Sequence, residues 1–112
     1  MTIFERIAAR EIAARIIHET DDWLAIHDAH PQAPVHVLII PKRPIPRLAA
    51  TRADDATLLG RMLQAIPELA RQVGVAESGY RVVINNGRDA GESVPHLHIH
   101  LLGGRALQWP PG

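Results

Sequence analysis

The amino-acid sequence predicts an α+β fold, with one antiparallel sheet and a helix packed on one of its faces. Two observations carry this prediction. Five short apolar segments are joined largely by short turns, and one longer segment repeats its apolar residues at helical spacing. A chain of 112 residues is long enough for one modest core and too short for two. We therefore expect residues 1–112 to form a single domain.

The first half of the chain predicts a short helix followed by three strands. The stretch Thr2-Ile3-Phe4-Glu5 has the form of a capping box, which predicts a helix over residues 3–9. Isoleucine-rich residues 13–19 and residues 23–27 predict a hairpin, with Thr20-Asp21-Asp22 as its turn. After a loop broken by two prolines, the nearly continuous apolar run over 35–40 predicts a well-buried strand.

The second half predicts the main helix and two further strands. Prolines predict a loop over residues 41–53, and the apolar spacing over 54–73 predicts a helix that ends before Gly74. Pro67 lies inside this pattern and is expected to kink the helix or divide it, because proline lacks the amide proton. Further along the chain we expect a strand at 80–84, a polar loop at 85–93 and a last strand at 96–102.

Composition excludes several classes of function. The 12 basic and 12 acidic residues balance, so no overall field attracts the chain to nucleic acid or to an anionic membrane. The chain has no cysteine, which excludes disulfides, thiolate zinc sites and cysteine nucleophiles. No apolar run reaches membrane-spanning length, and the N-terminus lacks the pattern of a signal peptide. We expect a soluble, cytoplasmic protein.

The stretch HLHIHLL, residues 96–102, is the strongest functional signal. In a strand, its three histidines would share one face, and the alternating Leu97, Ile99 and Leu101 would face the helix and core. Imidazole is a common zinc ligand, but alternate residues over this length spread across roughly 13 Å, so one ion would require a sharp bend. Imidazoles can also divide nucleophile and proton-donor roles on a phosphate. The preceding loop, with Gly87 and Gly91, favours phosphate and leaves metal open.

The sequence resembles the histidine triad (HIT) superfamily of nucleotide hydrolases and transferases. Residues 96–102 fit its His-φ-His-φ-His-φ-φ signature, and residues 27–42 resemble its first block. Residues 85–93, Gly103-Gly104-Arg105 and the Trp-Pro-Pro-Gly ending look like the Hint branch of nucleoside phosphoramidases. The resemblance implies a HIT-like fold, with a five-stranded antiparallel sheet, one long and one short helix, and sheets joined across a homodimer.

The resemblance also implies catalytic roles. His98 would attack the α-phosphorus of a nucleoside 5′-phosphoramidate, forming a nucleotidyl-histidine intermediate that water hydrolyses. His100 would hydrogen-bond the phosphoryl oxygens, and His96 would help to fix the ring of the nucleophile. His36 resembles a supporting fourth histidine, and Ser93 would help the leaving group. No cofactor and no metal are implied.

A purine nucleotide, most simply AMP or an adenosine phosphoramidate, is the implied ligand. Asp28 resembles the carboxylate that holds the ribose hydroxyls, and Asn85 would lie near the phosphate. Backbone groups at Gly91, Glu92 and Ser93 would face the phosphate, and the base pocket would be lined by Ile3, Phe4, Ile7, Ile26 and Ala29. Trp109 would either contact the partner subunit's substrate or pack on its own subunit.

Two alternatives remain at this point: a dinucleoside polyphosphate hydrolase of the neighbouring branch, and a nucleotide-binding regulatory protein with incidental activity. The sequence also departs from the expected pattern. Asn86 stands where an acidic residue is expected, and His30 stands two positions after Asp28. Neither residue is expected to touch the chemistry.

Overall fold

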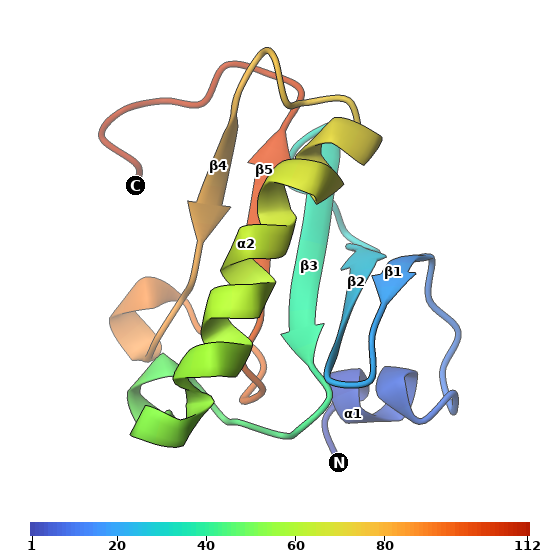
Figure 1. Ribbon diagram of the computed structural model, residues 1–112. Coiled ribbons are helices and arrows are strands. Elements are labelled where there is room, and N and C mark those ends of the chain that lie inside the picture. The colour runs from blue at the N-terminus through green and yellow to red at the C-terminus, as the bar shows by residue number, and fades with distance from the viewer.

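The computed structural model describes residues 1–112 and contains one five-stranded sheet, which confirms the predicted fold class (Figure 1). The strand order is β1-β2-β3-β5-β4, and each neighbouring pair is antiparallel. The strands are β1 (Ile16–Glu19), β2 (Trp23–His27), β3 (Val35–Pro41), β4 (Tyr80–Val83) and β5 (Ile99–Gly103). The two α-helices are α1 (Ile3–Ala8) and α2 (Ala56–Gln72). Neither helix is long and apolar enough to cross a membrane.

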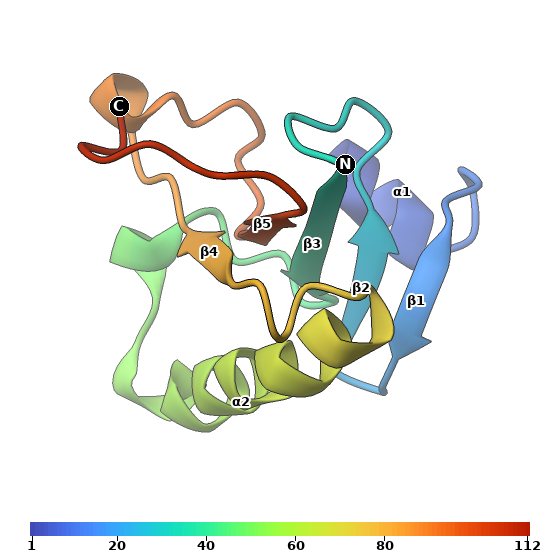
Figure 2. The same ribbon diagram turned by 90° about the horizontal axis from the view of Figure 1, so that it is seen from above.

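The sheet separates two apolar clusters. Figure 2 shows α2 on one side of the sheet and α1 on the other. Alternate strand residues such as Ala25, Ile39 and Leu101 pack with Met62 and Ile66 of α2. The intervening residues of β2 and β3 face α1, and the cluster there contains Phe4, Ile7, Leu24, Ile26, Leu38 and Ile40. The continuous apolar run of β3 is therefore explained by a strand that is covered on both faces.

The predicted capping box forms at the start of α1. The Thr2 hydroxyl accepts a hydrogen bond from the Glu5 amide, and the Glu5 carboxylate accepts one from the Thr2 amide. Phe4 and Ile7 are the buried residues of this helix. The cap therefore holds α1 so that its apolar side covers the sheet.

Helix α2 is continuous, so the expectation that Pro67 would divide it is wrong. Proline cannot donate to the carbonyl of Leu63, but Leu63 and Pro67 both lie on the exposed side, where water can bond that carbonyl. The buried side, with Met62, Ile66 and Leu69, keeps the helix on the sheet. Gly74 follows the helix with φ of 81°, as expected for a glycine beyond a helix end.

Two predicted strands begin later than the sequence suggests. The strand predicted over residues 13–19 starts at Ile16, and residues 13–15 instead line a pocket. The strand predicted over 96–102 starts at Ile99, so His96 and His98 precede it. Their side chains bond main-chain carbonyls, as described below, and the chain turns where the His96 amide donates to the Val94 carbonyl. Ile99 and Leu101 still face α2, as predicted.

Candidate active site

A pocket of about 900 Å³ lies on the α1 side of the sheet. One wall is apolar and comes from α1, β2 and the segment that joins α1 to β1. The other wall is polar and brings together Asp28, His36, Ser93, His98 and His100. These five residues come from three separate parts of the sequence. The register explains how two of them meet, because His100 of β5 lies opposite Leu38, two residues beyond His36 on β3.

Most of the predicted site residues line this pocket. The predicted base-binding residues Ile3, Phe4, Ile7, Ile26 and Ala29 all belong to its wall. Phe4, Ile7 and Ile26 are at the same time buried core residues, so these three positions belong both to the core and to the pocket wall. The predicted residues outside the lining are His96, Asn85, Gly91 and Glu92.

His96 is a fully buried support beneath the pocket. Its Nε2 donates a hydrogen bond to the Pro41 carbonyl at 2.7 Å, which leaves Nδ1 to accept from the Thr2 hydroxyl at 3.2 Å. The Thr2 side chain is the helix cap described above, so α1 and the histidine row are joined directly. The ring centre of Phe4 lies 5.8 Å from that of His96 and 4.9 Å from that of His98.

His98 has one nitrogen fixed and the other free. Its Nδ1 lies 2.7 Å from the His96 carbonyl oxygen, so Nδ1 carries the proton and donates it. In the neutral tautomer the unprotonated nitrogen is therefore Nε2, which has no protein partner and is reached by solvent. An imidazole in this tautomer presents a lone pair to the pocket, which is the arrangement required of a nucleophile.

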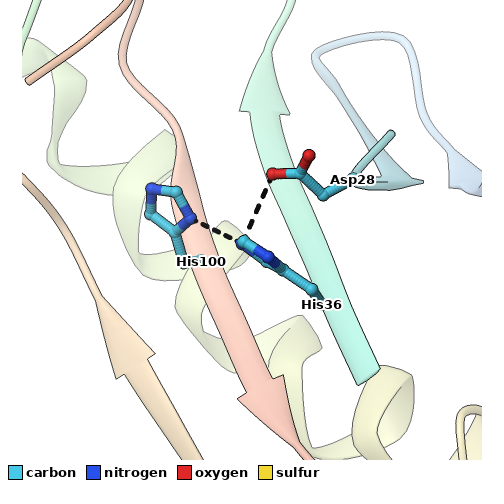
Figure 3. Close-up of side chains that lie close together, drawn as sticks. All are labelled: Asp28, His36 and His100. Carbon is cyan, nitrogen blue, oxygen red and sulfur yellow. Dashed lines mark hydrogen bonds and ion pairs between the residues drawn. The ribbon is translucent and has the colours of Figure 1, made fainter. Parts of the chain in front are cut away.

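His36 and His100 form a directed hydrogen-bond chain, which Figure 3 shows together with Asp28. The Gln32 amide donates to His36 Nδ1 at 3.0 Å, so the proton of the neutral His36 ring is on Nε2. This Nε2 lies 2.9 Å from His100 Nδ1 and 3.4 Å from Asp28 Oδ2. His100 Nδ1 is then an acceptor, and its Nε2 keeps a proton that it can donate. The Asn85 side-chain amide lies 3.5 Å from that nitrogen, and against a protonated Nε2 it presents its oxygen.

Burial keeps these supporting rings neutral. Desolvation lowers the pKa of His100 to about 4, with His98 and His36 adding to the effect. Desolvation also lowers the pKa of His36, although Asp28 opposes the shift, and it lowers the pKa of His96. Neutral rings have one donor and one acceptor nitrogen each, so the hydrogen-bond directions above hold at neutral pH.

The cluster of Asp28, His36 and His100 can be compared with the requirements of a metal site. Donor atoms of Asp28, His36 and His100 lie within 4.8 Å of one another, which is close enough to consider a shared cation. A neutral His36 that bound metal through Nε2 would need its proton on Nδ1, where it would face the Gln32 amide proton. The donor set therefore fits a hydrogen-bond chain better than a metal site.

The loop before the histidine row is held by side chains. Ser93 reaches the pocket, whereas the Glu92 carboxylate accepts hydrogen bonds from the Arg47 guanidinium and from the Gly87 amide. Gly91 has φ of 80°, a conformation that favours glycine. The proposed contact of Glu92 with a nucleotide is thus left to its backbone, because its side chain is occupied.

Sequence reasoning missed three contributors to the site. The Gln32 amide fixes the His36 tautomer, residues 12–15 form part of the pocket wall, and Arg47 holds the loop that carries Ser93. The Gln32 contact spans only four residues, but a backbone amide has no residue signature. The Arg47 contact joins segments that are 45 residues apart. Asp28, predicted as a site residue, also accepts the His30 amide, which fixes its orientation at the pocket edge.

Comparison with known proteins identifies this architecture. A structure of a HIT family hydrolase from Legionella pneumophila superposes with a TM-score of 0.96 at 44% identity, covering 100% of both chains. A histidine triad nucleotide-binding protein from Candida albicans gives a TM-score of 0.83 at 32% identity, over 98% of this chain and 83% of that one.

Sequence relatives agree with these structures. An uncharacterized HIT-like protein from Synechocystis is 51% identical over 111 residues, which cover 99% of this chain and 96% of that protein. The family model described as the HIT domain matches residues 9–107, which include the histidine row and its supporting His36. The chain therefore belongs to the HIT domain family.

Proposed function

We propose that this protein hydrolyses purine nucleoside 5′-phosphoramidates, with adenosine as the preferred nucleoside, through a nucleotidyl-histidine intermediate on His98. The observation that carries the proposal is the His98 tautomer. Its Nδ1 proton is bonded to a carbonyl, so a lone pair on Nε2 remains available in a pocket that also holds a proton donor, His100. The hydrolase from Legionella pneumophila and the nucleotide-binding protein from Candida albicans support a hydrolase acting on a nucleotide.

In the first step, His98 Nε2 attacks the α-phosphorus while the bond from phosphorus to the amine nitrogen breaks. The electron pair of that bond stays on the amine, which takes up a proton from the Ser93 hydroxyl as it leaves, and the hydroxyl regains a proton from solvent. The His98 ring becomes cationic, and the carbonyl oxygen of His96 at Nδ1 stabilises that charge. In the second step, water attacks phosphorus, the bond from phosphorus to Nε2 breaks, and the proton of the water goes to solvent.

His100 stabilises charge on the phosphoryl oxygens. Because its Nδ1 accepts from His36, its Nε2 proton is available for a phosphoryl oxygen. The ring is neutral because burial lowers the pKa of His100 to about 4, so it acts as a hydrogen-bond donor of fixed direction. Preorganised donors of this kind contribute about a hundredfold to a thousandfold in rate when they meet developing charge.

The rest of the pocket suits a nucleoside. Its apolar wall, with Phe4, Ile7 and Ile26, provides a surface for a flat purine base. Asp28 lines the same pocket beside His36 and offers a carboxylate to ribose hydroxyls. Asn85, near His100, is placed to contact the phosphate. The absence of a large net charge agrees with phosphate binding by local groups.

We further propose a homodimer, as the resemblance to the Hint branch implies. Strand β4 is an edge strand, and its exposed Tyr80 and Val82 are apolar groups that a second sheet would cover. Trp109 in the C-terminal tail is 80% exposed, and the Arg81 guanidinium of β4 lies 5.9 Å from its ring centre. Cytoplasmic location stays a prediction from the sequence.

The His98→Ala variant tests the reaction. We expect it to lose turnover of adenosine 5′-phosphoramidate by about a millionfold, to the limit of detection, as for loss of a nucleophile. AMP binding should persist, because Asp28 and the apolar wall are intact. In the wild type, rapid quenching with labelled substrate should reveal an adenylyl group on His98 by mass spectrometry.

Three outcomes would overturn the proposal. Turnover of His98→Ala at the wild-type rate would exclude His98 as the nucleophile. Cleavage of diadenosine polyphosphates far faster than phosphoramidates would indicate the neighbouring branch. Tight AMP binding by the wild type without turnover of any phosphoramidate would indicate a nucleotide-binding regulatory protein.

A further inference from the structure

Arg47 and Glu92 form a clasp between two loops that flank the active site. The Arg47 Nε donates to both carboxylate oxygens of Glu92, at 3.0 and 3.3 Å, and Nη2 donates to Oε2 at 3.1 Å. Arg47 belongs to the proline-rich segment 41–53, and Glu92 belongs to the polar loop 85–93. The clasp therefore joins segments that are 45 residues apart.

The Glu92 carboxylate also closes its own loop. The Gly87 amide donates to Glu92 Oε1 at 3.0 Å, and the Glu92 amide donates to the Gly87 carbonyl at 3.1 Å. This turn contains Gly87 with φ of 87° and Gly91 with φ of 80°, so its backbone is inherently permissive. The shape of this loop is thus held by one carboxylate, which accepts hydrogen bonds from a guanidinium and from a main-chain amide.

The opposite half of the clasp is anchored independently. The Leu97 amide donates to the Ile45 carbonyl at 2.7 Å, and the Ala49 amide donates to Asn86 Oδ1 at 2.8 Å. These bonds bracket Arg47 in sequence and tie its segment to the loop and to the histidine row. Arg47 therefore projects from a fixed base, which reduces the entropy lost in holding Glu92.

Neither member of the clasp lines the pocket, but Ser93, the residue after Glu92, does. We propose that Arg47 is a positioning residue: it holds Glu92 and thereby places the Ser93 hydroxyl beside the leaving group. This role rests on the proposed function, in which the departing amine needs a proton. Without Arg47 the loop would keep Ser93 but lose its placement.

The burial of one member of the clasp, Glu92, distinguishes it from an ordinary surface pair, although the Arg47 side chain is 38% exposed. The Glu92 side chain is 13% exposed, whereas both members of the Arg71 and Glu68 pair on α2 are more than half exposed. The bonds from Arg47 and from the Gly87 amide also lower the pKa of Glu92, so the carboxylate stays ionised across the working range. Because Arg71 and Glu68 share the same paired geometry far from the pocket, they provide a matched control.

Dependence on the leaving group is the critical readout. An amine must be protonated as it leaves, whereas p-nitrophenolate leaves from the p-nitrophenyl ester of AMP as a stable anion. We expect Arg47→Gln to lower kcat for an alkylamine phosphoramidate by up to about a hundredfold, and to leave kcat for the ester close to that of the wild type. Arg71→Gln should leave both rates unchanged.

A double variant tests whether Arg47 acts through Ser93. If it does, Arg47→Gln with Ser93→Ala should cleave the amine substrate no more slowly than Ser93→Ala alone. The positioning role would be overturned if the loss of kcat in the double variant equalled the product of the two single losses. It would also be overturned if Arg47→Gln lowered kcat equally for the amine and ester substrates. Thermal unfolding of Arg47→Gln and Arg71→Gln, measured in parallel, separates placement from general loss of stability.

Amide hydrogen exchange tests the clasp without any substrate. The Gly87 and Glu92 amides are hydrogen-bonded within the loop, so they should exchange faster in Arg47→Gln and at the wild-type rate in Arg71→Gln. Unchanged exchange in Arg47→Gln would overturn the proposal. If the wild type cleaved neither substrate, the proposed function would fail, and exchange alone would decide whether Arg47 orders the loop.

Discussion

Each histidine of the pocket takes its role from its hydrogen-bond partner. His96 donates to a carbonyl and is buried, His98 donates to a carbonyl and leaves Nε2 free, and His100 accepts from His36 and keeps its proton for the pocket. The identical side chains therefore differ in tautomer and exposure. Two of these three partners are main-chain carbonyls, so the residue types in the sequence do not reveal which histidine has which role.

His36 is expected to act through His100. In His36→Asn the donor to His100 Nδ1 is displaced, so His100 can place its proton on Nδ1 and lose its donor toward phosphate. We expect kcat for adenosine phosphoramidate to fall by about tenfold to a hundredfold, less than the hundredfold to thousandfold expected for His100→Ala. Steady-state kinetics of the two variants measure this order.

His18→Asn provides the matched control, because His18 packs beside Trp23, at a ring-centre distance of 5.3 Å, outside the pocket. Its kinetics should equal those of the wild type. A His36→Asn variant that is as slow as His98→Ala would contradict a supporting role and indicate direct participation in the chemistry.

At the scale of elements, periodicity predicted which segments would be helices and strands, and which side of the histidine row would face the core. Apolar alternation sets the facing of Ile99 and Leu101 regardless of where the ladder begins. The start of β5 was not predictable, because the preceding main-chain amides bond outside the strand ladder: His96 donates to the Val94 carbonyl and Leu97 donates to the Ile45 carbonyl. Local sequence does not encode such a choice of partner.

The sequence predicted the site residues whose side-chain type indicates their chemistry. It did not predict the residues whose role depends on a contact formed only in the folded chain. His36, Asp28 and Ser93 reach the pocket, as the resemblance implied. The clasp was not foreseen, because Arg47 lies in a segment whose prolines predict only a loop, and its partner is 45 residues away. That loop serves as a scaffold for the site.

Helix α2 allows a direct measurement of what Pro67 costs. In Pro67→Ala the new amide can donate to the Leu63 carbonyl, and the ring no longer crowds the preceding turn. Against this, the unfolded chain gains flexibility. We expect a net rise of about 1 to 2 kcal/mol in the free energy of unfolding, measured by urea titration.

Pro67 is exposed, so the substitution removes no core contact. The neighbouring exposed substitution Glu68→Ala keeps the proline and should change stability by less than about 0.5 kcal/mol. Destabilisation by Pro67→Ala would show that the proline fits the helix without strain.

For the whole molecule, the sheet divides two different environments. The α2 side is an apolar core, whereas the α1 side combines an apolar cluster with buried imidazoles around a pocket. Burying these rings favours their neutral forms, and burial lowers the pKa of His36, His96 and His100. Folding and the titration of the active site are consequently linked.

The linkage predicts that acid weakens the fold before most carboxylates titrate. The three histidines have folded pKa values below the unfolded value of 6.5, so the unfolded state binds more protons as the pH falls below about 6.5. Stability is therefore full above that pH and is lost as the pH falls toward 4. We expect the free energy of unfolding to fall by an amount on the order of 1 to 2 kcal/mol between pH 7 and pH 5, because solvent screens part of the effect. Urea unfolding at each pH measures this change. His100→Asn should reduce this dependence. Equal stability of the wild type at both pH values would contradict the linkage.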